Sequence, residues 1–294
     1  MSEQPRRQRA AVAENGGRRD LNRPPAPEPL PLPVTDNHTH LDIGDGMSPF
    51  TVEQALAASA AVNVPRAVQV GCDLPGARWA VEAAQRYPEL VAAVALHPNE
   101  APVLAGRGEL DAALAEIEEL AGVDVVRAVG ETGLDYFRTG EEGRAAQEES
   151  FRRHIDLAKR LGKPLMIHDR DAHDDILKVL LSEGVPDAWV MHCFSGDAEF
   201  ARRCLDLGAH LSFAGTLTFK NAAPLREALA VTPTDRILVE TDAPFLTPHP
   251  YRGRPNAGYL IPHTVRAMAE VTGRALDEIC AALEENTVRV YGAW

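Results

Sequence analysis

The chain has 294 residues, of which 45% are hydrophobic, and it carries a formal net charge of −13. A chain of this length can bury one large core, and length alone permits one large domain or two small ones. The negative net charge excludes non-specific binding of nucleic acid by a chain that is basic overall. A nucleic-acid substrate would have to be held locally, by metals and a few arginines.

Residues 1–33 differ in composition from the rest of the chain. Five arginines between Arg6 and Arg19 precede a proline-rich stretch from Pro24 to Pro33. Such a segment cannot bury enough apolar surface to offset its ordering entropy, which predicts a disordered tail. An Arg-rich tail could contact nucleic acid or an acidic partner, and an inert extension is the other open interpretation.

From residue 34 onward, short apolar segments alternate with longer amphipathic ones. This alternation predicts repeated strand–helix units and a parallel sheet in one domain that spans residues 34–294. Eight strands are expected, near Val34–His40, Arg66–Gly71, Val91–His97, Val126–Glu131, Pro164–His168, Ala188–His192, His210–Ala214 and Ile237–Asp242.

Helical periodicity fills most of the intervals between these strands. The expected helices are Val52–Val62, Ala77–Tyr87, Leu110–Ala121, Glu142–Leu161, Asp174–Ser182, Ala198–Leu207 and Pro262–Val271. Eight strands with intervening helices predict a TIM barrel of the α/β class. In that fold, catalytic residues stand at the C-terminal ends of the strands, where the following loops build the pocket.

Side chains that bind metals close five of the predicted strands. His38 and His40 are two residues apart, so in an extended strand both point to the same face and can bind one ion together. Later strands end in Glu131, His168, His192 and Asp242. Imidazole and carboxylate ligands suit Zn, Mn, Fe or Mg. A His-x-His pair alone is a weak signal, but five strand ends that converge on one mouth predict a metal-dependent hydrolase.

Two arginines are candidates for substrate contacts. Arg170 follows His168 by two residues and could clamp a phosphate oxygen through its planar guanidinium, or pair with a neighbouring aspartate. Arg252 lies in a long polar loop, Thr247–Tyr259, after the last strand. Long loops at this end of a barrel usually shape the substrate site, so Arg252, together with Arg254 of the same loop, would supply positive charge that the acidic chain otherwise lacks.

His97 and Glu240 also belong to the predicted mouth. His97 ends the third strand and could contact the phosphate or the leaving group, or make a structural hydrogen bond. Glu240 precedes Asp242 by two residues and should face the same side. It could orient a ligating imidazole from behind or form an ion pair deep in the barrel.

The ordered motifs at the strand ends carry a family resemblance. They read DNHTHLD (36–42), LHP (96–98), GETGLDY (130–136), IHDRDA (167–172), HCFSG (192–196) and ETDAPF (240–245). Through them the chain resembles the TatD family of metal-dependent deoxyribonucleases, among the amidohydrolase-like barrels, from about Val34 to Trp294. Family members commonly have Glu-Pro after Asn256, where this chain has Ala257 and Gly258, which leaves the contacts of that loop open.

The resemblance implies a site with two divalent metal ions, Mg, Mn or Zn. His38, His40 and Asp242 would hold one ion, His168 and His192 the other, and Glu131 would bridge them. A hydroxide held by the metals would attack a DNA phosphodiester, with Asp242 as general base or as the group that orients the water. Single-stranded DNA or frayed ends would be the substrate, cleaved as an exonuclease does.

Two other functions remain open. The same hydroxide could attack a carbonyl carbon, as in an amidohydrolase acting on an amide, a lactone or an aminoacyl-tRNA ester, because fold does not decide between substrates. A protein of another class would be a metal-bound scaffold without turnover. Its weakness is that the full ligand set, Asp242 included, is intact.

Cysteine usage and hydropathy bear on the cellular compartment. The four cysteines show no CxxC spacing, which favours reduced thiols with a default role as small core residues. No run approaches the roughly 20 apolar residues that a membrane span needs, and the N-terminus lacks the apolar core of a signal peptide. We therefore expect a cytoplasmic protein with no membrane contact and no obligate protein partner.

Overall fold

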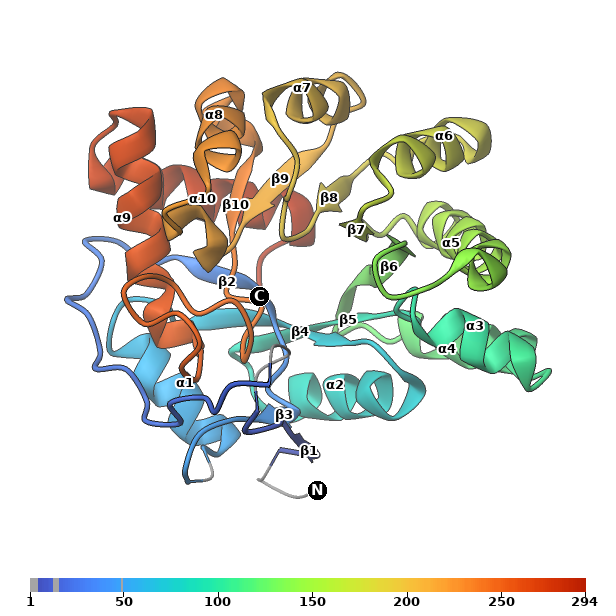
Figure 1. The fold of residues 1–294 in the computed structure, drawn as a ribbon, viewed down its shortest axis with the longest axis horizontal. Coiled ribbons are helices and arrows are strands. Elements are labelled where there is room, and N and C mark those ends of the chain that lie inside the picture. Colours follow the sequence, from blue (N-terminus) through green and yellow to red (C-terminus); the bar gives the residue numbers. More distant parts are fainter. Residues whose placement is uncertain (1–4, 13–15, 49) are drawn as a thin grey trace.

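Eight parallel strands form the centre of the molecule (Figure 1), in the hydrogen-bonded order β10-β9-β8-β7-β6-β5-β4-β2. The computed structural model describes residues 5–12, 16–48 and 50–294. The central strands are β2 (Thr35–Thr39), β4 (Arg66–Gly71), β5 (Leu90–Val94), β6 (Val126–Asp135), β7 (Leu165–Arg170), β8 (Trp189–Met191), β9 (His210–Phe213) and β10 (Ile237–Val239). Each of the eight predicted strands overlaps one of them.

The sheet closes into a barrel between β2 and the segment that follows β10. The amide of His40 donates to the Ala243 carbonyl at 2.8 Å, and the amide of Asp242 donates to the His38 carbonyl at 2.9 Å. The side-chain amide of Asn37 donates to the Val239 carbonyl at 3.0 Å. These bonds confirm the predicted TIM barrel and bring the C-terminal ends of its first and last strands side by side.

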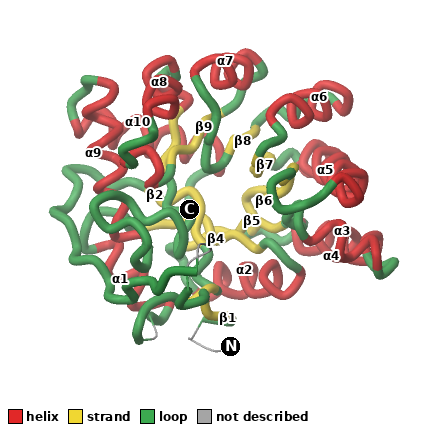
Figure 2. Tube along the Cα trace, viewed as in Figure 1, coloured by secondary structure: helices red, strands yellow, loops and turns green. Residues whose placement is uncertain are grey.

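Helices surround the strands, as Figure 2 shows. They are α1 (Val52–Ala60), α2 (Leu74–Arg86), α3 (Glu100–Gly106), α4 (Leu110–Ala121), α5 (Glu141–Leu161), α6 (His173–Glu183), α7 (Ala198–Asp206), α8 (Ala223–Val231), α9 (Ile261–Thr272) and α10 (Leu276–Tyr291), with short 3₁₀ turns at Gly215–Thr218, Thr234–Arg236 and Gly258–Leu260. Within the described ranges, none of these helices is both long and apolar enough to cross a bilayer.

All seven predicted helices are present, and α3, α8 and α10 are additional. Helices α3 and α8 have 7 and 9 residues, and each has a proline in its first turn, so they show little periodicity. Helix α10 is different, because its buried residues Ile279, Leu283 and Thr287 recur every fourth position, a pattern that the sequence displays.

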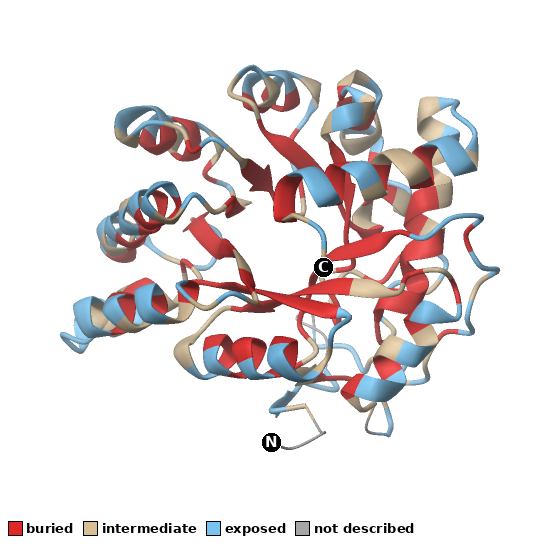
Figure 3. Ribbon diagram, turned by 180° about the vertical axis from the view of Figure 1, so that it is seen from behind, coloured by how far each residue is buried: buried red, intermediate tan, exposed pale blue. Residues whose placement is uncertain are grey.

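The core has two layers, inside the barrel and between the sheet and the helices. Val68 and Val70 of β4 belong to the inner cluster and Ala67 to the outer one, as the two-residue period of a strand requires. Figure 3 shows buried strands and helices that are buried mainly on their inward faces. Val290 and Tyr291 of α10 join the inner cluster. This helix therefore closes the end of the barrel where the strands begin, and a site can open only at the other end.

Where the sequence predicts a disordered tail, the described residues 5–12 and 16–33 lie against the barrel. Strand β1 (Arg7–Gln8) pairs in parallel with β3 (Ile43–Gly44), which follows β2. The Tyr259 hydroxyl donates to the Pro24 carbonyl at 2.8 Å, and Leu30 is only 2% exposed. The difference arises because this segment is held mainly by ion pairs and backbone bonds, which an argument from apolar composition does not count. Residues 1–4 and 13–15 of the predicted tail lie outside the described residues.

Candidate metal centre

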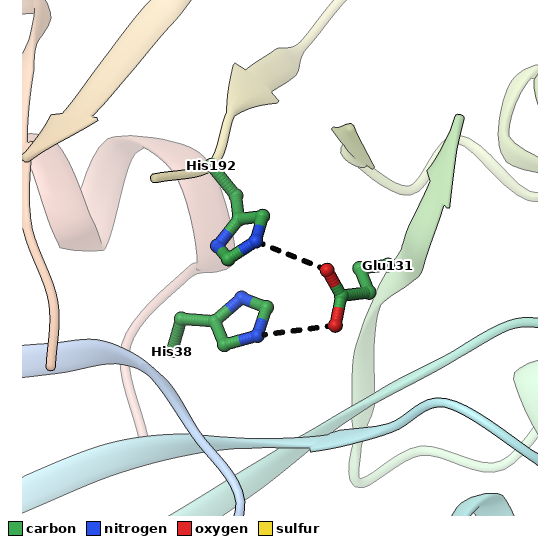
Figure 4. A group of neighbouring side chains, drawn as sticks. All are labelled: His38, Glu131 and His192. Atoms are coloured by element: carbon green, nitrogen blue, oxygen red, sulfur yellow. Dashed lines mark ion pairs between the residues drawn. The ribbon is translucent and has the colours of Figure 1, made fainter. Parts of the chain in front are cut away.

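Glu131 of β6 lies at the centre of a cluster of imidazoles. Its Oε2 atom is 3.0 Å from Nε2 of His192 and 3.1 Å from Nδ1 of His168. Its Oε1 atom is 3.7 Å from Nε2 of both His38 and His40. Figure 4 shows the carboxylate between His38 and His192, with one oxygen directed toward each ring. The two oxygens therefore face two different groups of imidazoles, as a bridging carboxylate must.

The first group consists of His38, His40 and Asp242. The Nε2 atoms of the two histidines lie 3.1 Å apart, so both rings point to the same side of the strand, as the spacing predicts. Oδ1 of Asp242 lies 3.3 Å from Nε2 of His40 and 3.8 Å from Nε2 of His38. Asp242 has a φ of +52°, a left-handed conformation that non-glycine residues adopt rarely and that clusters at functional sites.

The second group consists of His168 and His192, and each ring has a further carboxylate on its other nitrogen. Nε2 of His168 is 3.4 Å from Oδ2 of Asp135, and Nδ1 of His192 is 2.9 Å from Oε1 of Glu240. Such contacts fix the orientation of a ligating ring and raise its basicity. Glu240 thus makes the contact behind an imidazole that its position in the sequence predicts.

His97 lies beside Glu131 and His168, and not at the outer rim of the barrel. Its Nε2 atom is 4.0 Å from Oε2 of Glu131. Its ring packs edge to face against the His168 ring, with the ring centres 4.5 Å apart. Its Nδ1 atom accepts a hydrogen bond from the amide of Asn99 at 3.1 Å. The Nε2 atom is therefore the one that faces the centre, within reach of a substrate or a cation beside Glu131.

The donor set fits divalent cations. Among the residues that the structure describes, four groups of three donors have ligand atoms that all lie within 4.8 Å of one another, and Glu131 belongs to three of them. A cation with ligands at about 2.1 Å holds those ligands about 3 to 4 Å apart, close to the separations described above. Imidazole nitrogens and carboxylate oxygens suit Zn, Mn or Mg, so the six residues predicted as ligands converge in an arrangement able to bind metal.

The electrostatics of the cluster are those of ligands arranged for a cation. Burial opposes the ionised form of Glu131, yet His192 and the other imidazoles hold the pKa of this carboxyl well below its usual range. Burial disfavours the protonated form of His40, but the Asp242 carboxylate raises its pKa to about 9. Burial also disfavours the protonated form of His168, but Asp135 and Glu131 raise its pKa to about 9.

Metal uptake is expected to release protons. With pKa values of about 9, His40 and His168 carry protons at pH 7 in the metal-free protein. His192 does so too, because Glu240 and Glu131 raise its pKa well above the usual range although burial opposes the protonated form. A cation must displace these protons, so apparent metal affinity should rise as the pH increases above 7. Calorimetric titrations in buffers of different ionisation enthalpy should show about three protons released per chain. Binding without any transfer of protons to the buffer would contradict this expectation.

Two further residues of the centre were not predicted from the sequence. Cys72, expected to be a core residue, donates from Sγ to Oε1 of Glu131 at 3.1 Å and lies 3.8 Å from Nδ1 of His40. Asp135 contacts His168, as described above. The position of both residues could have indicated a functional role. Cys72 immediately follows β4 and Asp135 ends β6, and a barrel presents its functional side chains at such strand ends.

The two arginines predicted to contact the substrate each lie over an aromatic ring. Both pairs are at the C-terminal ends of the strands. The guanidinium of Arg170 lies 3.8 Å from the ring centre of Phe137, which is 58% exposed. The guanidinium of Arg252 lies 4.4 Å from the ring centre of Phe219. The pairing of Arg170 with a neighbouring aspartate, the alternative left open by the sequence, is not among its described contacts. Each arginine thus offers a positive charge beside an aromatic face.

Glu240 gives a direct test of the groups behind the ligands. We expect Glu240→Gln to weaken metal binding about 10- to 100-fold, because His192 would lose the carboxylate that orients its ring and raises its basicity. Isothermal titration of the metal-free protein measures this change. The matched control is Glu284→Gln, which alters a carboxylate bonded to Arg66 and Thr35 at the opposite end of the barrel. Equal affinities for both variants would show that Glu240 serves only the core.

Comparisons with known proteins agree with this geometry. A family model described as "TatD related DNase" matches residues 35–292. A Mycobacterium tuberculosis protein named "Uncharacterized metal-dependent hydrolase TatD" is 47% identical over 263 residues, which cover 88% of this chain and 98% of the relative. The Bacillus subtilis protein "Uncharacterized metal-dependent hydrolase YabD" is 38% identical over 257 residues, 87% of this chain and 98% of the relative.

A similar structure has also been solved. The crystal structure of YJJV, described as a TatD homolog from Escherichia coli K12, superposes with a TM-score of 0.79 and 28% sequence identity. The match covers 89% of this chain and 98% of that one. The resemblance stated from the sequence motifs is therefore confirmed, and the chain belongs to the TatD family of metal-dependent hydrolases.

Proposed function

We propose that this metal-dependent hydrolase cleaves phosphodiester bonds of DNA with two divalent cations, Mg, Mn or Zn. The observation that carries the proposal is the position of Glu131, whose two carboxylate oxygens face separate groups of imidazoles. Two cations would be held by these imidazoles together with Asp242 and the Glu131 carboxylate, and they would supply Lewis acidity to a bound phosphodiester. The family description as a DNase points to the same chemistry.

Bound cations would lower the pKa of water toward neutrality and neutralise charge on the phosphoryl oxygens. The chain supplies the positioning. Asp242, with its Oδ1 toward His40, orients the attacking water and accepts its proton. Its side chain is 17% exposed, while those of His38 and Glu131 are at most 6% exposed. Asp242 is therefore, with the 18% exposed His168, one of the ligands that an entering substrate can meet.

The rim of the barrel favours a nucleic acid over a small amide or lactone. Phe137 with Arg170 and Phe219 with Arg252 each combine a positive charge with an aromatic ring. Binding sites for single-stranded nucleic acids use this combination, because cations follow the phosphates and rings stack on the bases. The buried ligands add a steric reason, since a single strand or a frayed end enters a barrel mouth more readily than a continuous duplex. We therefore propose exonucleolytic cleavage of such ends.

A panel of substrates tests this function. The purified chain, supplied with Mg, Mn or Zn, is offered labelled single-stranded DNA, duplex DNA, RNA, a lactone and an aminoacyl-tRNA. We expect single-stranded DNA to be shortened from one end, which the labelled products identify, and we expect His168→Ala to abolish the reaction. The control is His263→Ala, a half-buried histidine of α9. Cleavage of the lactone or the aminoacyl ester alone would replace the proposal with an amidohydrolase function.

A further inference from the structure

The N-terminal segment lies at the rim of the barrel, outside the part of the chain that the TatD family model matches. Strand β1 adds to β3, which starts three residues after His40. The amide of Arg7 donates to the Asp42 carbonyl at 3.0 Å, and the amide of Arg9 donates to the Gly44 carbonyl at 2.8 Å. Since β3 belongs to the loop after the first barrel strand, this pairing places β1 beside the end of the barrel where the strands end.

Further contacts fix the rest of the segment along the last loop of the barrel. The guanidinium of Arg254 donates to the carbonyls of Asn22 and Arg23 at 2.9 and 3.0 Å. The Nε atom of Arg19 donates to the Gly253 carbonyl at 3.2 Å. In Figure 1 this N-terminal segment, drawn in dark blue, runs beside the orange loop that follows β10. Arg254 thus binds this chain's own N-terminal segment.

Arg9 contacts the residues that follow Asp242. Its Nη1 atom donates to the carbonyl of Pro244, two residues after Asp242. Its guanidinium lies 4.7 Å from the ring centre of Phe245, and that ring meets the His40 ring edge to face at 6.3 Å. Burial and Arg19 lower the pKa of Arg9, while the charges of Asp45 and Asp242 act in the opposite direction. Arg9 therefore stands within electrostatic reach of Asp242.

The charges around Arg9 do not cancel. Arg9 and Arg19 share one carboxylate, that of Asp45, whose side chain is only 2% exposed. Arg19 is 3% exposed and contacts both carboxylate oxygens, whereas Arg9 is 25% exposed and lies 3.4 Å from Oδ2. This group of three side chains keeps one positive charge in excess, and the more accessible guanidinium is that of Arg9.

We propose that Arg9 is a substrate-binding residue of the metal centre and holds a phosphate oxygen of a DNA strand that enters beside Asp242. This inference rests on the proposed phosphodiesterase function. It assigns to the N-terminal segment the task of supplying positive charge at the mouth of an acidic protein. The backbone of Arg9 is fixed in the β1–β3 pair, and its guanidinium lies against the Phe245 ring. Arg9 therefore loses little conformational entropy when it binds an anion.

Kinetics of the full-length chain test the inference. On a labelled oligothymidylate, Arg9→Ala should raise KM roughly 10- to 100-fold, the effect of one hydrogen bond to a charged group, with kcat largely unchanged. The slope of log KM against log salt should fall by about 0.7, because one phosphate contact is lost. Arg9→Lys should recover part of the affinity. Arg18→Ala removes an exposed arginine of the same segment and should leave KM unchanged.

A binding measurement separates failure of this inference from failure of the proposed function. Fluorescence anisotropy of the same oligonucleotide is measured for His168→Ala alone and for His168→Ala combined with Arg9→Ala. Weaker binding by the double variant, with a smaller salt slope, supports the role of Arg9 even if the wild-type chain cleaves no DNA. Equal binding by the two proteins, or an unchanged KM in a chain that does cleave DNA, overturns it. The same metal content within each pair, wild type with Arg9→Ala and His168→Ala with the double variant, shows that the effect does not arise at the ligands.

Discussion

Glu131→Gln is expected to bind divalent metal weakly and to lose hydrolytic activity by about a thousandfold or more, a loss of several kcal/mol of transition-state stabilisation. The reason is the position of the side chain, which lies within 4 Å of the four histidines predicted as ligands, His38, His40, His168 and His192. The glutamine side chain has one neutral oxygen and an NH₂ group in place of the two carboxylate oxygens. It can therefore bind a cation beside one group of imidazoles but not beside the other. Elemental analysis after dialysis and a hydrolysis assay measure both losses.

The control for Glu131 is Glu119→Gln, which changes an exposed carboxylate on α4 in the ring of outer helices. It should keep both the metal and the activity of the wild-type chain. A Glu131→Gln protein that retains two equivalents of metal and normal turnover would show that the cluster is not the catalytic centre. Thermal unfolding of both variants shows whether any loss arises from the fold instead.

Asp242→Asn is expected to reduce kcat by about 100- to 10,000-fold, the range for loss of a group that moves or positions a proton. Asp242 is the carboxylate of the first group, its side chain is 17% exposed, and its backbone amide donates a hydrogen bond to the His38 carbonyl that holds it at the mouth. An asparagine has a similar shape but cannot accept the proton of the attacking water. The measurement is kcat at saturating metal, together with the metal content of the variant.

Metal content decides how the Asp242 result is interpreted. A slow variant with full metal occupancy supports the proton-handling role, and a near-normal rate with full occupancy rules it out. A slow variant that has lost metal shows that Asp242 acts chiefly as a ligand. The control is Asp235→Asn, an exposed aspartate just before β10, at the opposite end of the same barrel strand, which should leave kcat unchanged.

The barrel could be predicted from the sequence because its signals are local. The apolar runs that became β4 and β6 are short and bounded by polar or glycine-rich turns, and the two-residue period of a strand put His38 and His40 on one face. In a parallel barrel every strand ends at the same rim. A polar residue at the end of each run was therefore enough to place Glu131, His168, His192 and Asp242 together.

What the sequence by itself determined about this protein is the fold and the six residues that could bind metal, since both follow from periodicity and from position along each strand. Only the tertiary structure decided which groups stand behind the ligands, that Cys72 touches Glu131, and that Arg9 lies beside Phe245 at the mouth. These contacts join residues from tens to more than 200 positions apart, as Arg9 and Pro244 show with a separation of 235. Their physical basis is charged and polar groups that meet partners across loops, which neither composition nor periodicity records. For that reason a segment that looks disordered in the sequence can pack, in its described part, against the rim of the barrel.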